Sequence, residues 1–121
     1  MQDRSHLPCG DKPNCVSTQD NREKFSLKPF TLNQGATLEQ IETAALSLGS
    51  AKTATKQGDY LRIEFTSRVF RFVDDLELRI DGDNLIVRSE SRTGHSDFGV
   101  NRKRANALRV ALEDAQLISP L

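Results

Sequence analysis

His95, Ser96 and Asp74 are the residue types that hydrolytic enzymes use as general base, nucleophile and carboxylate partner. His95 and Ser96 are neighbours in the sequence, however, and adjacency alone does not give the geometry of a catalytic triad. Asp74 and Asp75 are adjacent on a predicted strand, so they point to opposite faces and do not readily share one metal ion. A hydrolase-like enzyme using His95, Ser96 and Asp74 is therefore the alternative hypothesis, and the sequence predicts no metal site and no cofactor.

Arginine is distributed unevenly along the chain, and its chemistry suits the recognition of anions. Nine of the eleven arginines fall at or after Arg62, where Lys103 is the only lysine. The planar guanidinium group pairs through two hydrogen bonds with a carboxylate or a phosphate. The second half of the chain therefore contains either a network of Arg–Asp pairs or a site for an anionic ligand.

The start of the last predicted helix carries the wrong charge for its dipole. Its first turn holds Arg102, Lys103 and Arg104, whereas the N-terminal end of a helix favours negative groups. Something negative should offset these cations. The candidates are Asp74 and Asp97 of the protein itself, or a bound anion.

Residue patterns predict the elements that must position these groups. Thr37 and Gln40 have capping-box spacing before an amphipathic stretch that stops at Gly49. Alternating apolar residues predict antiparallel strands that place Phe70 and Phe72 on the core side. The predicted elements are a helix at 37–48, strands at 52–57, 60–67, 70–80 and 85–92, and a helix at 101–115. We therefore predict an α+β fold: a four-stranded antiparallel meander sheet with two helices packed on one face.

The apolar inner face of the predicted sheet becomes polar at the end away from the 81–84 turn. Ser67, Asp74, Ser89 and Ser91 meet there, and the segment 92–99 leaves from the same end. On the other face, Glu77 and Arg88 are predicted to form an ordinary ion pair in solvent. The predicted ligand site gathers the polar residues of the inner end and the helix start: Arg68, Arg71, Asp74, Ser89, Ser91, Arg92, Ser96, Asp97, Asn101, Arg102 and Arg104.

Residues 1–36 are predicted to form an irregular N-terminal arm that lays Phe25, Leu27 and Phe30 against the core. Cys9 and Cys15 bracket Gly10, Pro13 and Asn14, turn formers that could bring the two sulfur atoms together. The alternatives are two free thiols or a reactive cysteine. A disulfide would indicate an oxidising compartment, the periplasm or the cell envelope if a leader has been removed, and otherwise the location is cytoplasmic.

Length and composition restrict the classes of function. The 121 residues suffice for one domain, which we divide into the arm (1–36) and a single α+β domain (37–121). The 17 basic and 17 acidic residues balance, with one Tyr and no Trp, so nucleic-acid binding is not expected. No apolar run is long enough for a transmembrane segment, and no signal peptide is evident.

Two long motifs resemble a known family: Ser67 to Arg79 (SRVFRFVDDLELR) and Arg88 to Arg104 (RSESRTGHSDFGVNRKR). With the early Cys9 and Pro13–Ser17 motif, they resemble the bacterial and plastid domain-of-unknown-function family numbered 1499 over nearly the whole chain. The resemblance implies no particular activity, because the family has no established one. Its members often resemble envelope proteins with a leader or membrane helices ahead of this domain, which supports a disulfide.

These observations favour a small soluble binding or interaction module over an enzyme. Its expected partner is an anionic small molecule or a component of the cell envelope, held by the cationic groups of the predicted site. A purely structural network of Arg–Asp pairs, with no ligand, remains open. The sequence does not determine the oligomeric state.

Overall fold

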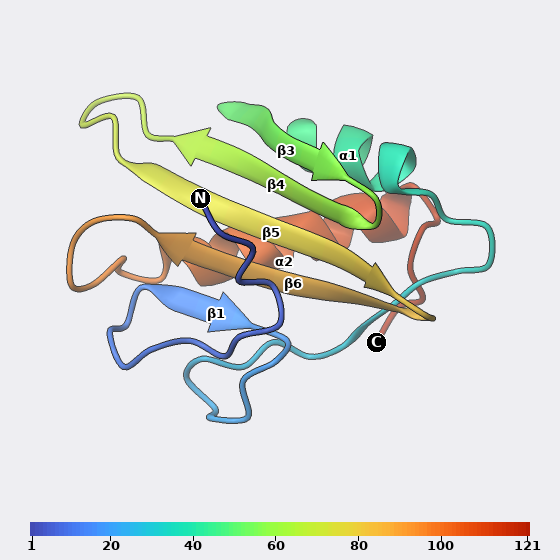
Figure 1. Ribbon diagram of the computed structural model, residues 1–121, viewed down its shortest axis with the longest axis horizontal. Coiled ribbons are helices and arrows are strands. Elements are labelled where there is room, and N and C mark those ends of the chain that lie inside the picture. The colour runs from blue at the N-terminus through green and yellow to red at the C-terminus, as the bar shows by residue number, and fades with distance from the viewer.

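A computed structural model describes residues 1–121 as six strands and two helices (Figure 1). All strand pairs are antiparallel, in the spatial order β1-β6-β5-β4-β3, and β2 pairs with β6. The predicted α+β class is confirmed, and β3 to β6 form the predicted meander. The elements are β1 (Cys15–Ser17), β2 (Phe30–Thr31), α1 (Leu38–Leu46), β3 (Ala51–Gln57), β4 (Tyr60–Thr66), β5 (Val73–Asp81), β6 (Asn84–Ser91) and α2 (Val100–Asp114).

The sheet has six strands where the sequence predicts four, because two segments of the N-terminal arm join it. β1 pairs with the Ser91 end of β6, and β2 pairs with the Asn84 end. These strands contain three and two residues, too few to show the alternating pattern by which a strand is recognised. The arm is thus less irregular than predicted. Its three apolar anchors, Phe25, Leu27 and Phe30, are buried as predicted.

Both helices pack on the same face of the sheet, behind it in Figure 1. The predicted capping box begins α1: Gln40 N donates to Thr37 Oγ1 (3.2 Å), and Thr37 N donates to Gln40 Oε1 (3.0 Å). α1 ends at Leu46, two residues before the predicted end. The core between helices and sheet contains mainly aliphatic side chains, among them Ile41, Leu61, Ile63, Leu76, Leu78, Val87, Leu108 and Leu112.

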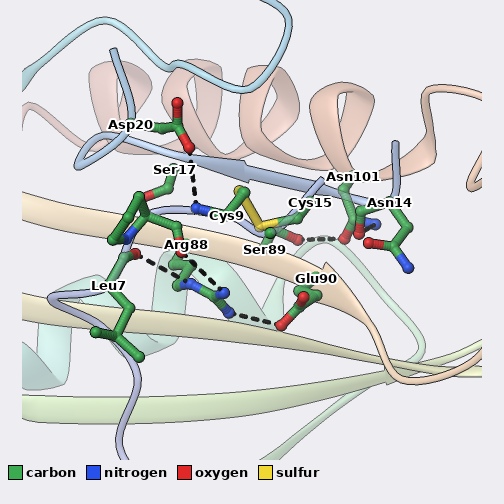
Figure 2. Close-up of a disulfide and its surroundings, with 12 residues drawn as sticks. Leu7, Cys9, Asn14, Cys15, Ser17, Asp20, Arg88, Ser89, Glu90 and Asn101 are labelled. Atoms are coloured by element: carbon green, nitrogen blue, oxygen red, sulfur yellow. Dashed lines mark hydrogen bonds and ion pairs between the residues drawn. A yellow bond between two sulfur atoms is a disulfide. The ribbon is translucent and has the colours of Figure 1, made fainter. Parts of the chain in front are cut away.

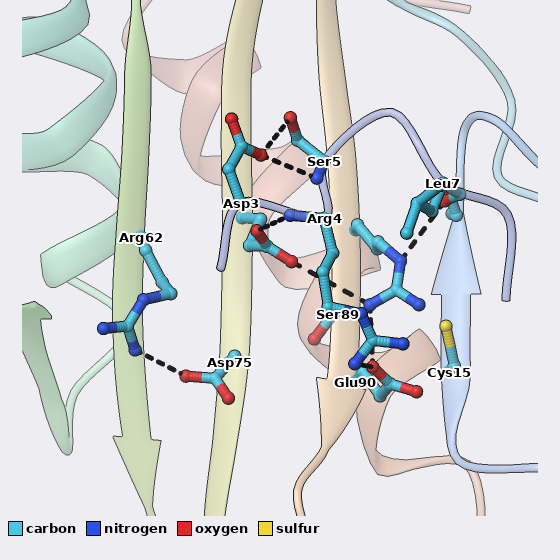
Figure 3. Close-up of polar contacts among 12 residues, drawn as sticks. Asp3, Arg4, Ser5, Leu7, Cys15, Arg62, Asp75, Ser89 and Glu90 are labelled. Atoms are coloured by element: carbon cyan, nitrogen blue, oxygen red, sulfur yellow. Dashed lines mark hydrogen bonds and ion pairs between the residues drawn. The ribbon is translucent and has the colours of Figure 1, made fainter. Parts of the chain in front are cut away.

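The outer face of the sheet is not open to solvent as predicted. Glu77 and Arg88 are each only 1% exposed, with 3.9 Å between their charged groups. The segment 1–8 crosses this face and covers them (Figures 1 and 3). Arg4 N donates to Glu77 Oε2 (2.8 Å), and Arg88 Nε donates to the Leu7 carbonyl (3.2 Å). The predicted solvent-exposed pair is therefore wrong, because the arm returns over the sheet.

The buried charges of this face are satisfied by further polar groups. Tyr60 donates its hydroxyl hydrogen to Glu77 (2.6 Å), and Arg88 donates to Glu90 (2.7 Å). Burial and the bond to Glu77 raise the pKa of Tyr60 far above its ordinary value, because both disfavour the phenolate. These bonds offset the cost of removing ionised groups from water.

A disulfide joins Cys9 to Cys15, as the turn residues between them indicate (Figure 2). The carboxylate of Asp20 holds the same region, because it accepts from Cys9 N (3.0 Å) and from Arg22 (2.8 Å). The Arg22 guanidinium also lies over the Phe25 ring, 4.1 Å from its centre. The disulfide and the half-buried Asp20–Arg22 ion pair therefore brace the arm internally, and the disulfide ties Cys9 to β1.

Removing the disulfide should destabilise the protein modestly, because the bond closes a loop with a sequence separation of only six. We expect Cys9→Ser/Cys15→Ser to lose about 2 kcal/mol of unfolding free energy. Urea unfolding with and without a reductant measures the loss. Reduced wild type is the control and should match the double variant. An unchanged stability would mean that Asp20 and the apolar anchors hold the arm without the bond.

Asp20 should make the stability of the fold depend on pH. Hydrogen bonds from Arg22 lower the pKa of Asp20 from 3.8 to about 2. The ionised Asp20 therefore stabilises the folded state. This contribution to the free energy of unfolding is complete above the unfolded-state pKa of Asp20 and disappears as the pH falls through the folded-state pKa. We expect Asp20→Asn to cost about 2 kcal/mol at neutral pH, and its difference from wild type to shrink between about pH 4 and pH 2.

Urea unfolding across this pH range tests the expectation. Asp11 also pairs with Arg22 but is fully exposed, so Asp11→Asn is the matched control and should change the stability much less than Asp20→Asn. A difference between Asp20→Asn and wild type that stays constant down to pH 2 would contradict the assignment.

Candidate functional site

The buried side-chain amide of Asn101 joins four segments at the polar end of the sheet. Asn101 is fully buried in the first turn of α2. Its Nδ2 lies within hydrogen-bond distance of the Asn14 carbonyl (3.1 Å), Ser91 Oγ (2.9 Å) and Asp97 Oδ2 (2.8 Å). Its Oδ1 accepts from Ser89 Oγ (2.6 Å; Figure 2). The amide thus connects α2 to the arm, to β6 and to the 92–99 segment.

Asp97 takes the place of a capping residue for α2. The helix begins after Gly99, which has a φ of 83° and no side chain for capping. One carboxylate oxygen of Asp97 accepts from Gly99 N (2.8 Å), and the other accepts from Asn101 N (3.1 Å). Asp97 therefore supplies negative charge at the helix start, where the dipole favours it.

Arg104 and Asp74 form an ion pair next to the Asn101 amide. Their charged atoms are 2.9 Å apart, and both side chains are largely shielded from water. Arg104 also donates to Asn101 Oδ1 (3.0 Å) and lies over the Phe65 ring, 4.6 Å from its centre. Asp74 and Asp97 are thus the protein's own negative groups beside the basic start of α2.

Two arginines of the predicted site lie elsewhere. Arg102 donates to the carbonyls of Lys24 (3.2 Å) and Ser26 (3.0 Å), so it fastens the arm. Arg92 lies on the outer face with Glu64 and Asp75, because the alternation of β6 puts it on the same side as Glu90. The prediction grouped both arginines in one site at the polar end of the sheet, and the structure separates them.

The outer-face cluster around Arg92 is neutralised within the protein. Arg92 donates to Asp75 (2.8 Å) and to Glu64 (2.6 Å), and Arg62 donates to Asp75 (2.9 Å; Figure 3). The bond from Arg92 lowers the pKa of Glu64. Burial alone would raise the pKa of Asp75, but the bonds from Arg92 and Arg62 outweigh it and hold that pKa below its ordinary value. A polar cleft of about 800 Å³ lies here, between the arm and the sheet.

A second cleft, of about 920 Å³, opens at the inner end of the sheet. It lies between the β4–β5 loop, the 92–99 segment and the first half of α2, and we call it the aromatic cleft. Its polar lining includes six residues of the predicted site: Arg68, Asp74, Ser91, Ser96, Asp97 and Arg104. Its apolar lining consists of Leu48, Phe65, Phe70, Phe72, Phe98, Val100 and Ala107.

The sequence prediction placed Phe70 and Phe72 in the core, and this is wrong. Phe70 is 72% exposed and Phe72 is 57% exposed, with their rings stacked 5.5 Å apart. β5 begins only at Val73, because Ser67 closes the preceding loop on itself. Ser67 N donates to the Phe72 carbonyl (2.9 Å), and Phe72 N donates to Ser67 Oγ (2.9 Å). Phe70 and Phe72 extend the apolar pattern at the even positions of β5, although they belong to the loop and not to the strand.

Other cleft residues absent from the predicted site include Phe98, Val100 and Lys103. A signal for Phe98 was present, since it stands alone between Asp97 and Gly99 in an otherwise polar segment. Phe98 belongs to no apolar pattern of a helix or strand that would predict its burial. An exposed position for this ring could therefore have been predicted.

The residue types of a hydrolase are present but are not assembled. His95 is exposed and has no hydrogen bond to Ser96 or Asp74. Ser96 Oγ accepts from Phe98 N (3.2 Å), and Asp74 is paired with Arg104. No group of three or more His, Cys, Asp or Glu side chains is placed to hold a metal ion. Neither helix has the length and apolar character needed to cross a bilayer.

The fold and the cleft define a small α+β domain whose antiparallel sheet carries two helices on one face and a cleft at one end. A family model described as a protein of unknown function (DUF1499) matches residues 7–112, and the chain belongs to this family. The resemblance indicated by the sequence motifs is thereby confirmed, and the matched region contains the aromatic cleft. No curated protein and no solved structure is significantly similar to the chain.

Replacing Asn101 should destabilise the protein strongly, because several buried polar groups would lose their partner. We expect Asn101→Ala to cost about 3 kcal/mol, the order of the cost of leaving buried groups unsatisfied. Urea unfolding measures this loss. Asn106, exposed on the same helix, is the matched control, and Asn106→Ala should change stability by less than about 0.5 kcal/mol. Equal effects of the two substitutions would disprove the role of the buried amide.

Proposed function

We propose that the protein is a binding module that holds an anionic ligand with an apolar part in the aromatic cleft. The observation that carries this proposal is the combination of unneutralised cations and aromatic side chains in one cavity. Three cations line it, Arg68, Lys103 and Arg104, against two acidic residues, Asp74 and Asp97. The cleft therefore has a formal charge of +1.

The pairing within the cleft determines which cations are available to a ligand. Arg104 is held by Asp74 at 2.9 Å, whereas Arg68 and Lys103 take part in no ion pair. Both of these side chains belong to exposed residues. An anionic group entering the cleft would gain their attraction without first breaking an internal ion pair.

The apolar lining favours a ligand that is more than an inorganic ion. Phe70 and Phe72 present stacked rings to the cavity, and Phe65 lies at its inner end beneath Arg104. Covering such surface with an alkyl or aromatic group contributes about 0.8 kcal/mol for each buried methylene. A phosphate or carboxylate joined to an apolar chain matches both halves of the lining.

Besides Arg92 and Arg102, three residues of the predicted site do not line the cleft: Ser89, Asn101 and Arg71. Ser89 and Asn101 are fully buried and bonded to each other at 2.6 Å. An envelope location, which a disulfide-bearing binding module would suit, stays a prediction from the sequence.

Calorimetric titration with alkyl phosphates tests the proposal. Hexyl, octyl and decyl phosphate, used below their micellar concentrations, should bind progressively more tightly, by up to about fifteenfold for each added pair of methylenes. Inorganic phosphate and a neutral alkyl glycoside should bind much more weakly than the alkyl phosphate of equal chain length. Affinity should fall with added salt, because the cations are exposed and therefore screened.

Variants of the two free cations identify the site. Lys103→Gln and Arg68→Gln should each weaken octyl phosphate binding about fivefold, the order of one exposed charge interaction. Lys52, exposed on the edge strand β3, provides the matched control, and Lys52→Gln should leave binding unchanged. The proposal would be disproved if the neutral and anionic amphiphiles bound equally tightly. It would also be disproved if Lys103→Gln and Arg68→Gln bound octyl phosphate as tightly as the control Lys52→Gln does.

A further inference from the structure

Exposed apolar side chains are concentrated around the mouth of the aromatic cleft. Phe98 is 91% exposed and Val69 is 81% exposed, and Phe70, Phe72 and Val100 are also exposed. These five account for half of the ten large apolar residues that the protein exposes. They come from two short segments, 67–72 and 98–100, which we call the rim. Apolar surface gathered in this way marks an interaction site more often than scattered residues do.

The backbone of the rim is strained at two places. Arg71 has a φ of 59° and Phe98 a φ of 52°, in the left-handed region that L-residues other than Gly, Asn and Asp rarely occupy. Each is unfavourable relative to an ordinary backbone conformation, because the Cβ atom crowds the following carbonyl oxygen. Strain of this kind concentrates at functional sites. Its presence in both rim segments supports a functional reason for their exposed side chains.

Cations accompany the apolar side chains of the rim. Arg68 and Arg71 belong to the 67–72 segment, which contains no acidic residue, and Lys103 lies one helical turn beyond the 98–100 segment. All three residues are exposed and make no ion pair. Asp97, next to Phe98, is occupied with the backbone at the start of α2. The rim therefore presents positive charge together with aromatic rings.

The rim lies at one end of the molecule. The β4–β5 loop and the β6–α2 segment both project past the strand ends, at the left of Figure 1. The aromatic cleft opens between them. Rings that project from two loops around a cavity can enter the disordered headgroup region of a bilayer. The adjacent cations match anionic headgroups, which attract nearby Lys and Arg side chains.

We propose that the rim docks the protein on an anionic lipid bilayer. Phe70, Phe72 and Phe98 enter the headgroup region, while Arg68, Arg71 and Lys103 meet lipid phosphates, so that the aromatic cleft opens towards the lipid. The inference rests on the proposed function, since it assigns the anionic amphiphile of the cleft to the class of acidic phospholipids.

Flotation with phosphatidylcholine vesicles, with and without phosphatidylglycerol, tests the docking. We expect the protein to float with the vesicles that contain phosphatidylglycerol and to remain unbound with pure phosphatidylcholine. Phe98→Gly should weaken vesicle binding about tenfold, the order expected for losing one inserted ring. Its thermal stability should equal or exceed that of wild type, because glycine accepts the left-handed conformation of position 98. A loss of binding with that result cannot come from unfolding.

Val69 and Arg71 separate docking from occupation of the cleft, because they belong to the rim but do not line the cavity. Val69→Ser and Arg71→Gln should each weaken vesicle binding about fivefold and leave octyl phosphate binding unchanged. Val110→Ser, exposed on α2 outside the rim, and Lys52→Gln are the matched controls and should change neither.

The outcomes distinguish the two proposals. Octyl phosphate binding without vesicle binding would overturn the bilayer inference in favour of a protein partner at the rim, and leave the proposed function standing. Absence of both would overturn both. The bilayer inference would also be overturned if the protein bound vesicles equally well with and without phosphatidylglycerol. Unchanged vesicle binding by Phe98→Gly, Val69→Ser and Arg71→Gln would overturn it too.

Discussion

The side-chain amide of Asn101 is the interaction on which the shape of the candidate site depends. Its contacts with Ser91 of β6, with the Asn14 carbonyl of the arm and with Asp97 fix where α2 begins. A buried amide that satisfies so many partners tolerates few alternative arrangements, because each displaced partner would be left unsatisfied in a dry environment. The position of Phe98, next to Asp97 in the same segment, follows from this constraint.

The two faces of the sheet differ in how far their cationic side chains are paired with carboxylates. On the outer face, the arm covers the strands, and the arginines of the strands there pair with Asp3, Glu64, Asp75 or Glu90. Of the three cations that line the aromatic cleft, only Arg104 has a carboxylate partner, and Arg68 and Lys103 make no ion pair. A protein with a formal net charge of zero can in this way present a local positive site. The distribution of pairs, rather than the composition, therefore directs an anion to the aromatic cleft.

Much of the fold could be predicted from the sequence, because its signals are local. The Thr37 capping box, the alternation in β4 and the 81–84 turn each specify structure within a few residues. The strands of the arm could not be predicted, since they exist only through pairing with β6. The covering of Glu77 and Arg88 by segment 1–8 depends on contacts across more than 70 residues of sequence. Within the site, the convergence of Asp74, Ser89 and Ser91 followed from strand register, whereas the outward turn of Phe70 depends on how Ser67 closes its loop.

A crystal structure of the protein with decyl phosphate would show whether the aromatic cleft binds an anion joined to an apolar chain. We expect a phosphate within hydrogen-bond distance of Lys103 and Arg68, an alkyl chain against Phe70 and Phe98, and an intact pair between Arg104 and Asp74. A ligand bound instead in the polar cleft between arm and sheet, or an aromatic cleft left empty at saturating ligand, would contradict this expectation.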